Sequence, residues 1–115
     1  MNDSEFFCLH SDLCKTLANA KRQAILNALR DGEASVSQIV ERTSIPQPTV
    51  SQHLATMRAK GVVIARREGA HVLYRVSNPK IIQAFDLITE VMRETLETQA
   101  RTVEPFAGSE DEDDR

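Results

Sequence analysis

The sequence predicts a mainly α-helical fold with one small β-hairpin, and two observations support this prediction. Apolar residues recur at three- and four-residue steps in five segments, which is the spacing of amphipathic helices. Directly after Gly61 the apolar period falls to two, over a pair of short runs separated by a glycine, which is typical of a hairpin. The expected order is therefore four helices, two strands and a long last helix.

The first three helices are short, and local signals mark their ends. Residues 5–17 carry apolar side chains on one face. Asn19 can cap a second helix, which the Asp-Gly pair at 31–32 ends, and Ser35 can cap a third. Residues 43–46 are a tight break that includes Pro46, so a short helix, a turn and a fourth helix follow one another as a helix-turn-helix.

The fourth helix, up to Gly61, is the segment around which the chain is organised. Pro48 is tolerated in a first helical turn, and Gly61 suits the position just after a helix end. One face of this helix is apolar, and the other is polar and has no Asp or Glu. A polar face without carboxylates suits a groove lined with phosphates, because its amides and hydroxyls meet no repulsion there.

The two strands cover residues 62–67 and 71–76, and a hairpin placed directly after such a helix forms a wing. Arg66, Arg67 and His71 lie near its tip, where they can reach a flanking phosphate or a minor groove. Because successive side chains alternate across a strand, we expect only one of the two arginines to face DNA.

The last helix begins after Ser77-Asn78-Pro79 and carries an apolar stripe as far as Leu96. This stripe is wider than one small domain can cover. Together with Phe6, Phe7 and Leu9 in the first helix, it predicts a two-fold dimer interface.

The charge is unevenly distributed along the 115 residues, which make a single domain. The net charge is −3, but residues 36–80 hold seven basic and two acidic side chains, a net charge of +5. Residues 104–115 carry a net charge of −5. We expect a folded domain over 1–101 and an acidic disordered tail over 102–115, which either solubilises the chain or competes with DNA for the basic middle.

Other function classes find little support in the sequence. No apolar run approaches the length of a membrane span and the first residues are acidic, so we expect a cytoplasmic protein with free thiols. The three histidines fall in separate elements, and no paired carboxylates, nucleophile elbow or phosphate loop are visible, so we expect no enzyme.

Four sequence elements occur together in one order. They are Leu17-Ala18 with Arg22 and Ile25-Leu26, then residues 49–54 (Thr-Val-Ser-Gln-His-Leu), then residues 61–63 (Gly-Val-Val), then Arg67-Glu68-Gly69 with Tyr74. Over roughly residues 5–100 this pattern resembles the ArsR/SmtB family of winged helix-turn-helix repressors. The resemblance implies a homodimer on a palindromic operator, usually a repressor that an inducer releases. Its DNA-reading positions here are Gln47, Thr49, Ser51, Gln52 and His53, with Arg66, Arg67 and His71 in the wing.

The sequence departs from the metal sites of this family. Where arsenic and cadmium sensors carry a Cys-x-Cys motif in the third helix, this chain has Ser35 and Ser37, which supply no thiolate. Where zinc sensors carry Asp-x-His in the last helix, it has Asp86 and Ile88, and that helix contains no histidine. We expect no cofactor beyond a candidate metal ion.

Cys8, His10 and Cys14 are the remaining candidates for sensing. His10 and Cys14 share a helix face at i, i+4 spacing, and two such pairs from two protomers could supply four metal ligands. A reversible thiol switch and plain packing of small apolar side chains are the alternatives. For His53, contact with a phosphate and local packing are both open.

These observations together predict a homodimeric transcriptional repressor that binds double-stranded operator DNA. The competing hypothesis is a winged-helix module that binds a protein partner and no DNA. Salt-dependent DNA binding separates the two, because phosphate contacts release counterions.

Overall fold

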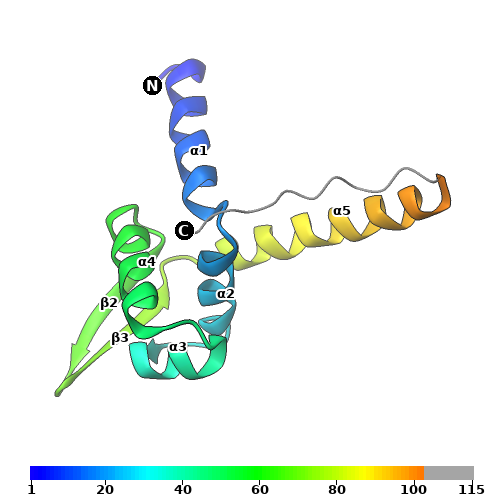
Figure 1. Cartoon of the computed structure of the whole chain (residues 1–115). Helices are drawn as coiled ribbons and strands as arrows, with labels where there is room; N and C mark the ends of the chain where they lie inside the picture. The colour runs from blue at the N-terminus through cyan, green and yellow to red at the C-terminus, as the bar shows by residue number, and fades with distance from the viewer. Residues whose placement is uncertain (103–115) are drawn as a thin grey trace.

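The computed structural model describes residues 1–102 and has the expected order of helices and strands, with one additional short strand (Figure 1). The elements are α1 (Asp3–Leu17), α2 (Ala20–Ala28), β1 (Ala34–Ser35), α3 (Val36–Thr43), α4 (Gln47–Ala59), β2 (Val63–Glu68), β3 (His71–Val76) and α5 (Lys80–Thr102). The architecture is a winged helix-turn-helix, as predicted.

Side-chain caps fix where the first three helices begin. Asn19 accepts hydrogen bonds from two backbone N–H groups of the first turn of α2, and Ser35 forms a capping box with Gln38 at the start of α3. Both predicted caps are confirmed. Asn2 and Glu5 form a second capping box, so α1 begins two residues earlier than its apolar spacing predicted.

A third strand joins the hairpin, and sequence patterning missed it. In β1, Ala34 pairs with Tyr74 and Ser35 with Leu73 of β3, which gives an antiparallel sheet in the order β1-β3-β2. Two residues are too few for an alternating pattern to be visible. The strand connects the middle of β3 to the loop after α2.

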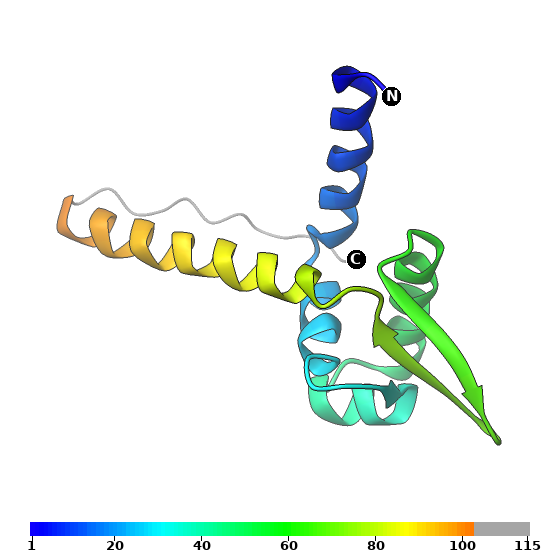
Figure 2. The same ribbon diagram turned by 180° about the vertical axis from the view of Figure 1, so that it is seen from behind.

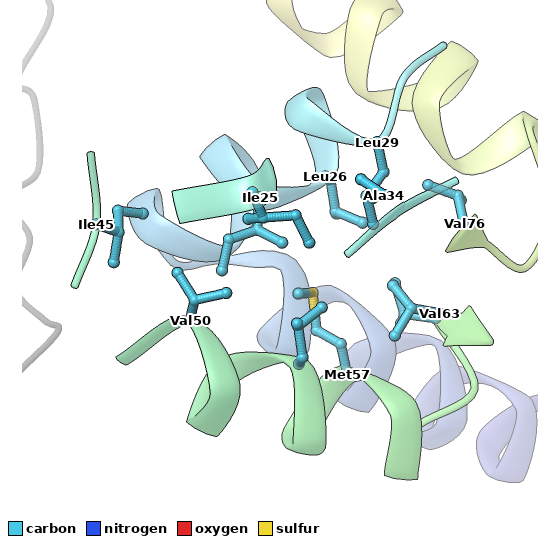
Figure 3. Close-up of a cluster of buried hydrophobic side chains, with 12 residues drawn as sticks. Ile25, Leu26, Leu29, Ala34, Ile45, Val50, Met57, Val63 and Val76 are labelled. Atoms are coloured by element: carbon cyan, nitrogen blue, oxygen red, sulfur yellow. The ribbon is translucent and has the colours of Figure 1, made fainter. Parts of the chain in front are cut away.

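The core lies between α2, α3, α4 and the inner face of the sheet (Figure 3). Every one of these elements contributes at least one buried apolar side chain. The buried residues are Ile25, Leu26, Leu29, Ala34, Ile39, Ile45, Val50, Leu54, Met57, Val62, Val63 and Val76. The helix-turn-helix and the wing therefore share a single core.

The end of α4 is bonded tightly to the wing. Gly61 has φ +78°, and its N–H donates to the carbonyl of Arg58 at 3.0 Å, while the N–H of Val62 donates to Met57 at 2.8 Å. On the other strand, the Ser77 N–H donates to the Val62 carbonyl at 2.9 Å and its Oγ to the Gly61 carbonyl at 2.7 Å. One end of the hairpin is thus bonded to the last turn of α4, and the other end to the two residues that follow this helix.

The first and last helices project away from this core (Figures 1 and 2). Thr16 is the one buried residue of α1, and Ile81 and Ile82 at the start of α5 are half-buried against the core. Farther out, Phe7 is 66% exposed and Leu87 is 61% exposed. Two long helices therefore leave their apolar faces uncovered within one chain.

The end of the chain lies largely outside the described residues. The helix α5 continues through Thr102, one residue into the segment predicted as a tail, and the acidic run belongs to residues 103–115, which are not described. Among the helices of residues 1–102, none is both long and apolar enough to cross a membrane.

Candidate nucleic-acid interface

One face of α4, the helix predicted to read DNA, packs on the core, and the opposite face is exposed. Val50, Leu54 and Met57 are at most 1% exposed and hold the helix on the core. Helical spacing places Gln52 on the opposite side, where it is exposed, with half-buried Thr49 beside it. The polar face predicted from sequence is therefore present, with Gln52 at its centre.

Gln47 and Ser51 occupy one flank of that face, one helical turn apart. The Gln47 amide Nε2 donates to the Ser51 Oγ at 2.8 Å, which orients both side chains. No carboxylate lies between residues 47 and 59. A base edge or phosphate approaching this flank therefore meets donors and acceptors without charge repulsion.

His53, the fifth predicted reading residue, is turned toward α2. Its Nδ1 accepts a hydrogen bond of 3.1 Å from the Arg22 Nε, and the Arg22 Nη1 donates to the Thr16 carbonyl at 3.0 Å. One guanidinium thus connects the end of α1, α2 and the middle of α4. This geometry supports the packing alternative for one ring nitrogen of His53 and requires that nitrogen to be unprotonated.

Arg22 is a residue that the prediction of reading positions left out. Its partner His53 is 31 positions away, so no local spacing connects the two. The available signal was its place in the sequence pattern that carried the family resemblance, where Arg22 follows Leu17-Ala18. Its role is to hold α4, since it contacts the inner flank of that helix.

The wing separates the three residues predicted at its tip. In the β2–β3 register Arg66 lies opposite Leu73 and Glu68 opposite His71, which puts Arg66 and His71 on one face. Arg67 lies opposite Val72, on the face that continues from buried Val63. As predicted, the two arginines point to opposite sides.

Arg66 is engaged by two carboxylates of its own chain. Its Nε and Nη2 donate to Glu33 at 2.5 and 2.8 Å, and Nη2 also lies 2.6 Å from a Glu68 oxygen. Hydrogen bonds from Arg66 hold the pKa of Glu33 below its ordinary value, and the two carboxylates raise the pKa of Arg66. The ion pair between Arg66 and Glu33 therefore favours the charged form of both partners.

The basic residues at the end of α4 and in β2 differ in whether they form an ion pair. Lys60 at the end of α4 pairs with Asp12 of α1 at 3.0 Å, which joins α1 to α4 a second time. Within residues 1–102, neither Arg58 nor Arg67 forms an ion pair, and both are exposed. These two guanidinium groups are the ones open to phosphate.

The candidate sensing residues lie on the exposed surface of α1. The Cys14 Sγ is 3.6 Å from the His10 Nδ1, so the predicted i, i+4 pair is in contact, while Cys8 stands apart. No group of three or more metal-binding side chains occurs among the described residues. Exposure of both thiols makes them accessible to oxidants, and two ligands from one chain are too few for a closed metal site.

Asp86, which matches the first zinc-ligand position of the family, has another partner. Arg30 at the end of α2 donates two hydrogen bonds to its carboxylate, at 2.8 and 2.9 Å. These bonds lower the pKa of Asp86. The carboxylate therefore connects α5 to α2 as one half of a bidentate ion pair.

Comparison with known proteins identifies the chain. A profile described as "Bacterial regulatory protein, arsR family" matches residues 19–65, and the transcriptional repressor PagR of Bacillus anthracis is 38% identical over 90 residues, which are 76% of this chain and 90% of PagR. The chain belongs to the ArsR family. It is accordingly a DNA-binding transcriptional regulator of winged helix-turn-helix fold and not an enzyme, as predicted.

Other relatives differ in the share of their length that this chain matches and in their named function. The regulator KmtR of Mycobacterium tuberculosis is 40% identical over 76 residues, and the matched region is 66% of this chain and 58% of KmtR. HlyU of Vibrio cholerae, 37% identical over 76 residues, is named a transcriptional activator, and the match covers 66% of this chain and 70% of HlyU. The relatives thus include a repressor and an activator.

A solved ArsR-type structure has the same architecture. A homodimeric winged helix-turn-helix DNA-binding domain from Mycobacterium bovis superposes with a TM-score of 0.74 at 32% identity. The superposition covers 85% of this chain and 93% of that domain.

Proposed function

We propose that this ArsR-family regulator is a homodimeric repressor that places one α4 helix in each of two successive major grooves of a two-fold symmetric operator. The observation that carries the proposal is the outer face of α4, which has Gln52 at its centre and no carboxylate, and which is followed along the chain by a wing with an exposed arginine. Amides that point away from the core suit recognition of base edges.

Uncovered apolar surface on α1 and α5 supports the dimer. Phe6, Phe7 and Leu9 are each more than half exposed, and so are Leu87, Ile88 and Val91 of α5. Apolar patches of this extent on a small chain mark an interface. The homodimeric Mycobacterium bovis domain supplies a precedent for pairing of this fold.

A two-fold dimer fixes the geometry of the operator. The two α4 helices require half-sites about one helical turn apart, or a multiple of it. Phosphate contacts from Arg58 and Arg67 would supply most of the affinity, so binding would weaken steeply with salt. Gln52 would determine which base sequence the protein prefers.

Repression is favoured over activation by the extent of similarity. The match to PagR, a named repressor, covers 90% of that protein, whereas the match to the activator HlyU covers 70% of its length. A reporter gene placed behind the operator decides between repression and activation. Deletion of a repressor raises expression of the reporter, whereas deletion of an activator lowers it.

For release from DNA, the candidate group is the pair Cys14 and His10 on α1. The 3.6 Å contact places a thiol beside a base that can accept its proton, on the helix that also bonds α4 through Asp12 and Lys60. Operator binding would be compared for reduced, oxidised and zinc-treated protein and for a Cys8→Ser, Cys14→Ser variant. Indifference of the parent to every treatment would remove both thiol and metal sensing.

Selection from random duplexes tests the DNA-binding proposal itself. We expect an enriched palindrome, and Gln52→Ala should broaden the enriched set while total affinity for mixed DNA stays close to that of the parent. Gln83→Ala on α5 is the matched control, since Gln83 is an exposed amide outside α4 and the wing. A soluble dimer without salt-dependent DNA binding would favour the protein-interaction module instead.

A further inference from the structure

Arg66 and Arg67 are neighbours in β2 with opposite surroundings. Arg66 faces two carboxylates, Glu33 and Glu68, and donates to Glu33 through two nitrogens. Arg67, on the other face of the hairpin, is exposed and forms no ion pair within residues 1–102. Two adjacent arginines that look equivalent in sequence are therefore not equivalent in the fold.

Glu33 belongs to the body of the domain and not to the wing. It lies in the loop after α2, directly before β1, whose Ala34 pairs with Tyr74 of β3. The Glu33–Arg66 contact thus connects β2, the outer strand of the sheet, to a loop next to β1 on the opposite edge. The wing is held across its width, by the β1–β3 ladder and by this ion pair.

The charge of this cluster argues against a phosphate contact. One guanidinium lies between two carboxylates, so Arg66, Glu33 and Glu68 together carry a net charge of −1. A phosphate approaching Arg66 would have to displace a two-point hydrogen-bonded carboxylate and would meet a second one. Arg67 offers a guanidinium without these obstacles.

We propose that Arg66 is a positioning residue that clamps the wing to the loop after α2, and that Arg67 makes the wing's phosphate contact. The assignment of Arg67 rests on the DNA-binding function proposed above, whereas the clamp is a property of the free protein. The two parts make different predictions and can fail separately.

The clamp is tested without DNA, by amide hydrogen exchange across the sheet. Glu33→Gln and Arg66→Gln should each raise the exchange rate of the β1–β3 and β2–β3 amides, because an end of the clamp is lost. Glu41→Gln is the matched control, since Glu41 is an exposed acid of α3 without an ion pair among the described residues. Unchanged exchange in the Glu33→Gln variant would overturn the clamp.

The phosphate contact is tested by the salt dependence of binding to mixed-sequence duplex DNA. Arg67→Gln should lower the slope of log affinity against log salt by about 0.9, the value for one lost phosphate contact. Arg66→Gln should weaken binding by roughly two- to fivefold, the scale of an exposed ion pair, with the slope unchanged. The reverse assignment, with the slope lowered by Arg66→Gln and not by Arg67→Gln, would overturn the proposal.

A charge swap gives the sharpest distinction between positioning and contact. The variant Arg66→Glu alone should lose affinity, and adding Glu33→Arg should restore it to within about threefold of the parent if the pair only positions the wing. If residue 66 instead touched phosphate, the new carboxylate would repel DNA in the double variant as well, and no restoration would occur. A parent protein without salt-dependent DNA binding would overturn the proposed function and the Arg67 assignment, while the exchange measurement would still decide the clamp.

Discussion

Apolar side chains are buried to different extents in the middle of the chain, from α2 to β3, and in its two end helices. The middle closes a core of twelve buried side chains around the helix-turn-helix and the sheet. The helices α1 and α5 leave large apolar side chains such as Phe7 and Leu87 more than half exposed. The core of the helix-turn-helix and the wing is thus closed within one chain, whereas the end helices leave apolar surface uncovered.

The largest expected effect separates the two regions by stability. Leu54→Ala removes a side chain that is 1% exposed and should lower the free energy of unfolding by about 3 kcal/mol, within the range for buried leucines. Leu96→Ala, the same substitution on the outer part of α5, is the comparison, because Leu96 is 45% exposed. Urea denaturation of the two variants at matched concentration checks this, and equal losses would contradict the division of the molecule.

The second prediction concerns assembly. Leu87→Asp puts a charge into the uncovered face of α5 and should raise the dimer dissociation constant by at least about 30-fold, the scale of a central interface residue. Sedimentation velocity over a concentration series measures it. Glu97→Lys, which changes charge on the opposite side of α5, is the control, and dissociation caused by the control alone would place the interface elsewhere.

A smaller effect is expected where the two regions meet. Arg22→Gln removes the hydrogen bonds to His53 and to the Thr16 carbonyl and should cost about 1–2 kcal/mol of unfolding free energy. A double-mutant cycle with His53→Gln should show coupling between the two positions, because they share the bond. Arg58→Gln, an exposed arginine of α4, serves as control, and additive losses in the cycle would contradict the bond.

The smallest effect is the pH dependence of the Arg30–Asp86 ion pair. Because Arg30 lowers the pKa of Asp86 in the folded state, the pair adds stability above the ordinary value of 3.8 and loses it as pH falls through the lower folded value. Asp86→Asn should remove this contribution at pH 7 and make stability less dependent on pH in the acid range. Thermal melts of parent and variant between neutral and acid pH measure this difference.

Local signals predicted most of the fold. The capping side chains Asn19 and Ser35, the change of period after Gly61 and the alternation of Arg66 and Arg67 were each visible within a few residues of sequence. These features depend on helix and strand geometry alone, so one chain segment is enough to predict them.

Contacts between distant segments could not be predicted in this way. Arg22 and His53 are 31 residues apart, Glu33 and Arg66 are 33 apart, and Arg30 and Asp86 are 56 apart. No periodicity connects such pairs, because only the packing of α2 against α4, the wing and α5 brings them together. The alternation rule therefore predicted that only one wing arginine faces DNA, and the tertiary contact of Arg66 with Glu33 is the observation from which we propose Arg67.

Ser77 connects the wing to the residues that follow α4, directly before α5 begins. It donates both of its hydrogen bonds to the carbonyls of Gly61 and Val62, which follow α4, and α5 begins three residues later. The end of α4, the base of the wing and the start of α5 therefore lie next to one another at Ser77. In the dimer proposed above, a tilt of α5 would therefore move α4 and the wing together and change the spacing between the two α4 helices. Under that proposal, release from DNA through a change of spacing would require no unfolding of either chain.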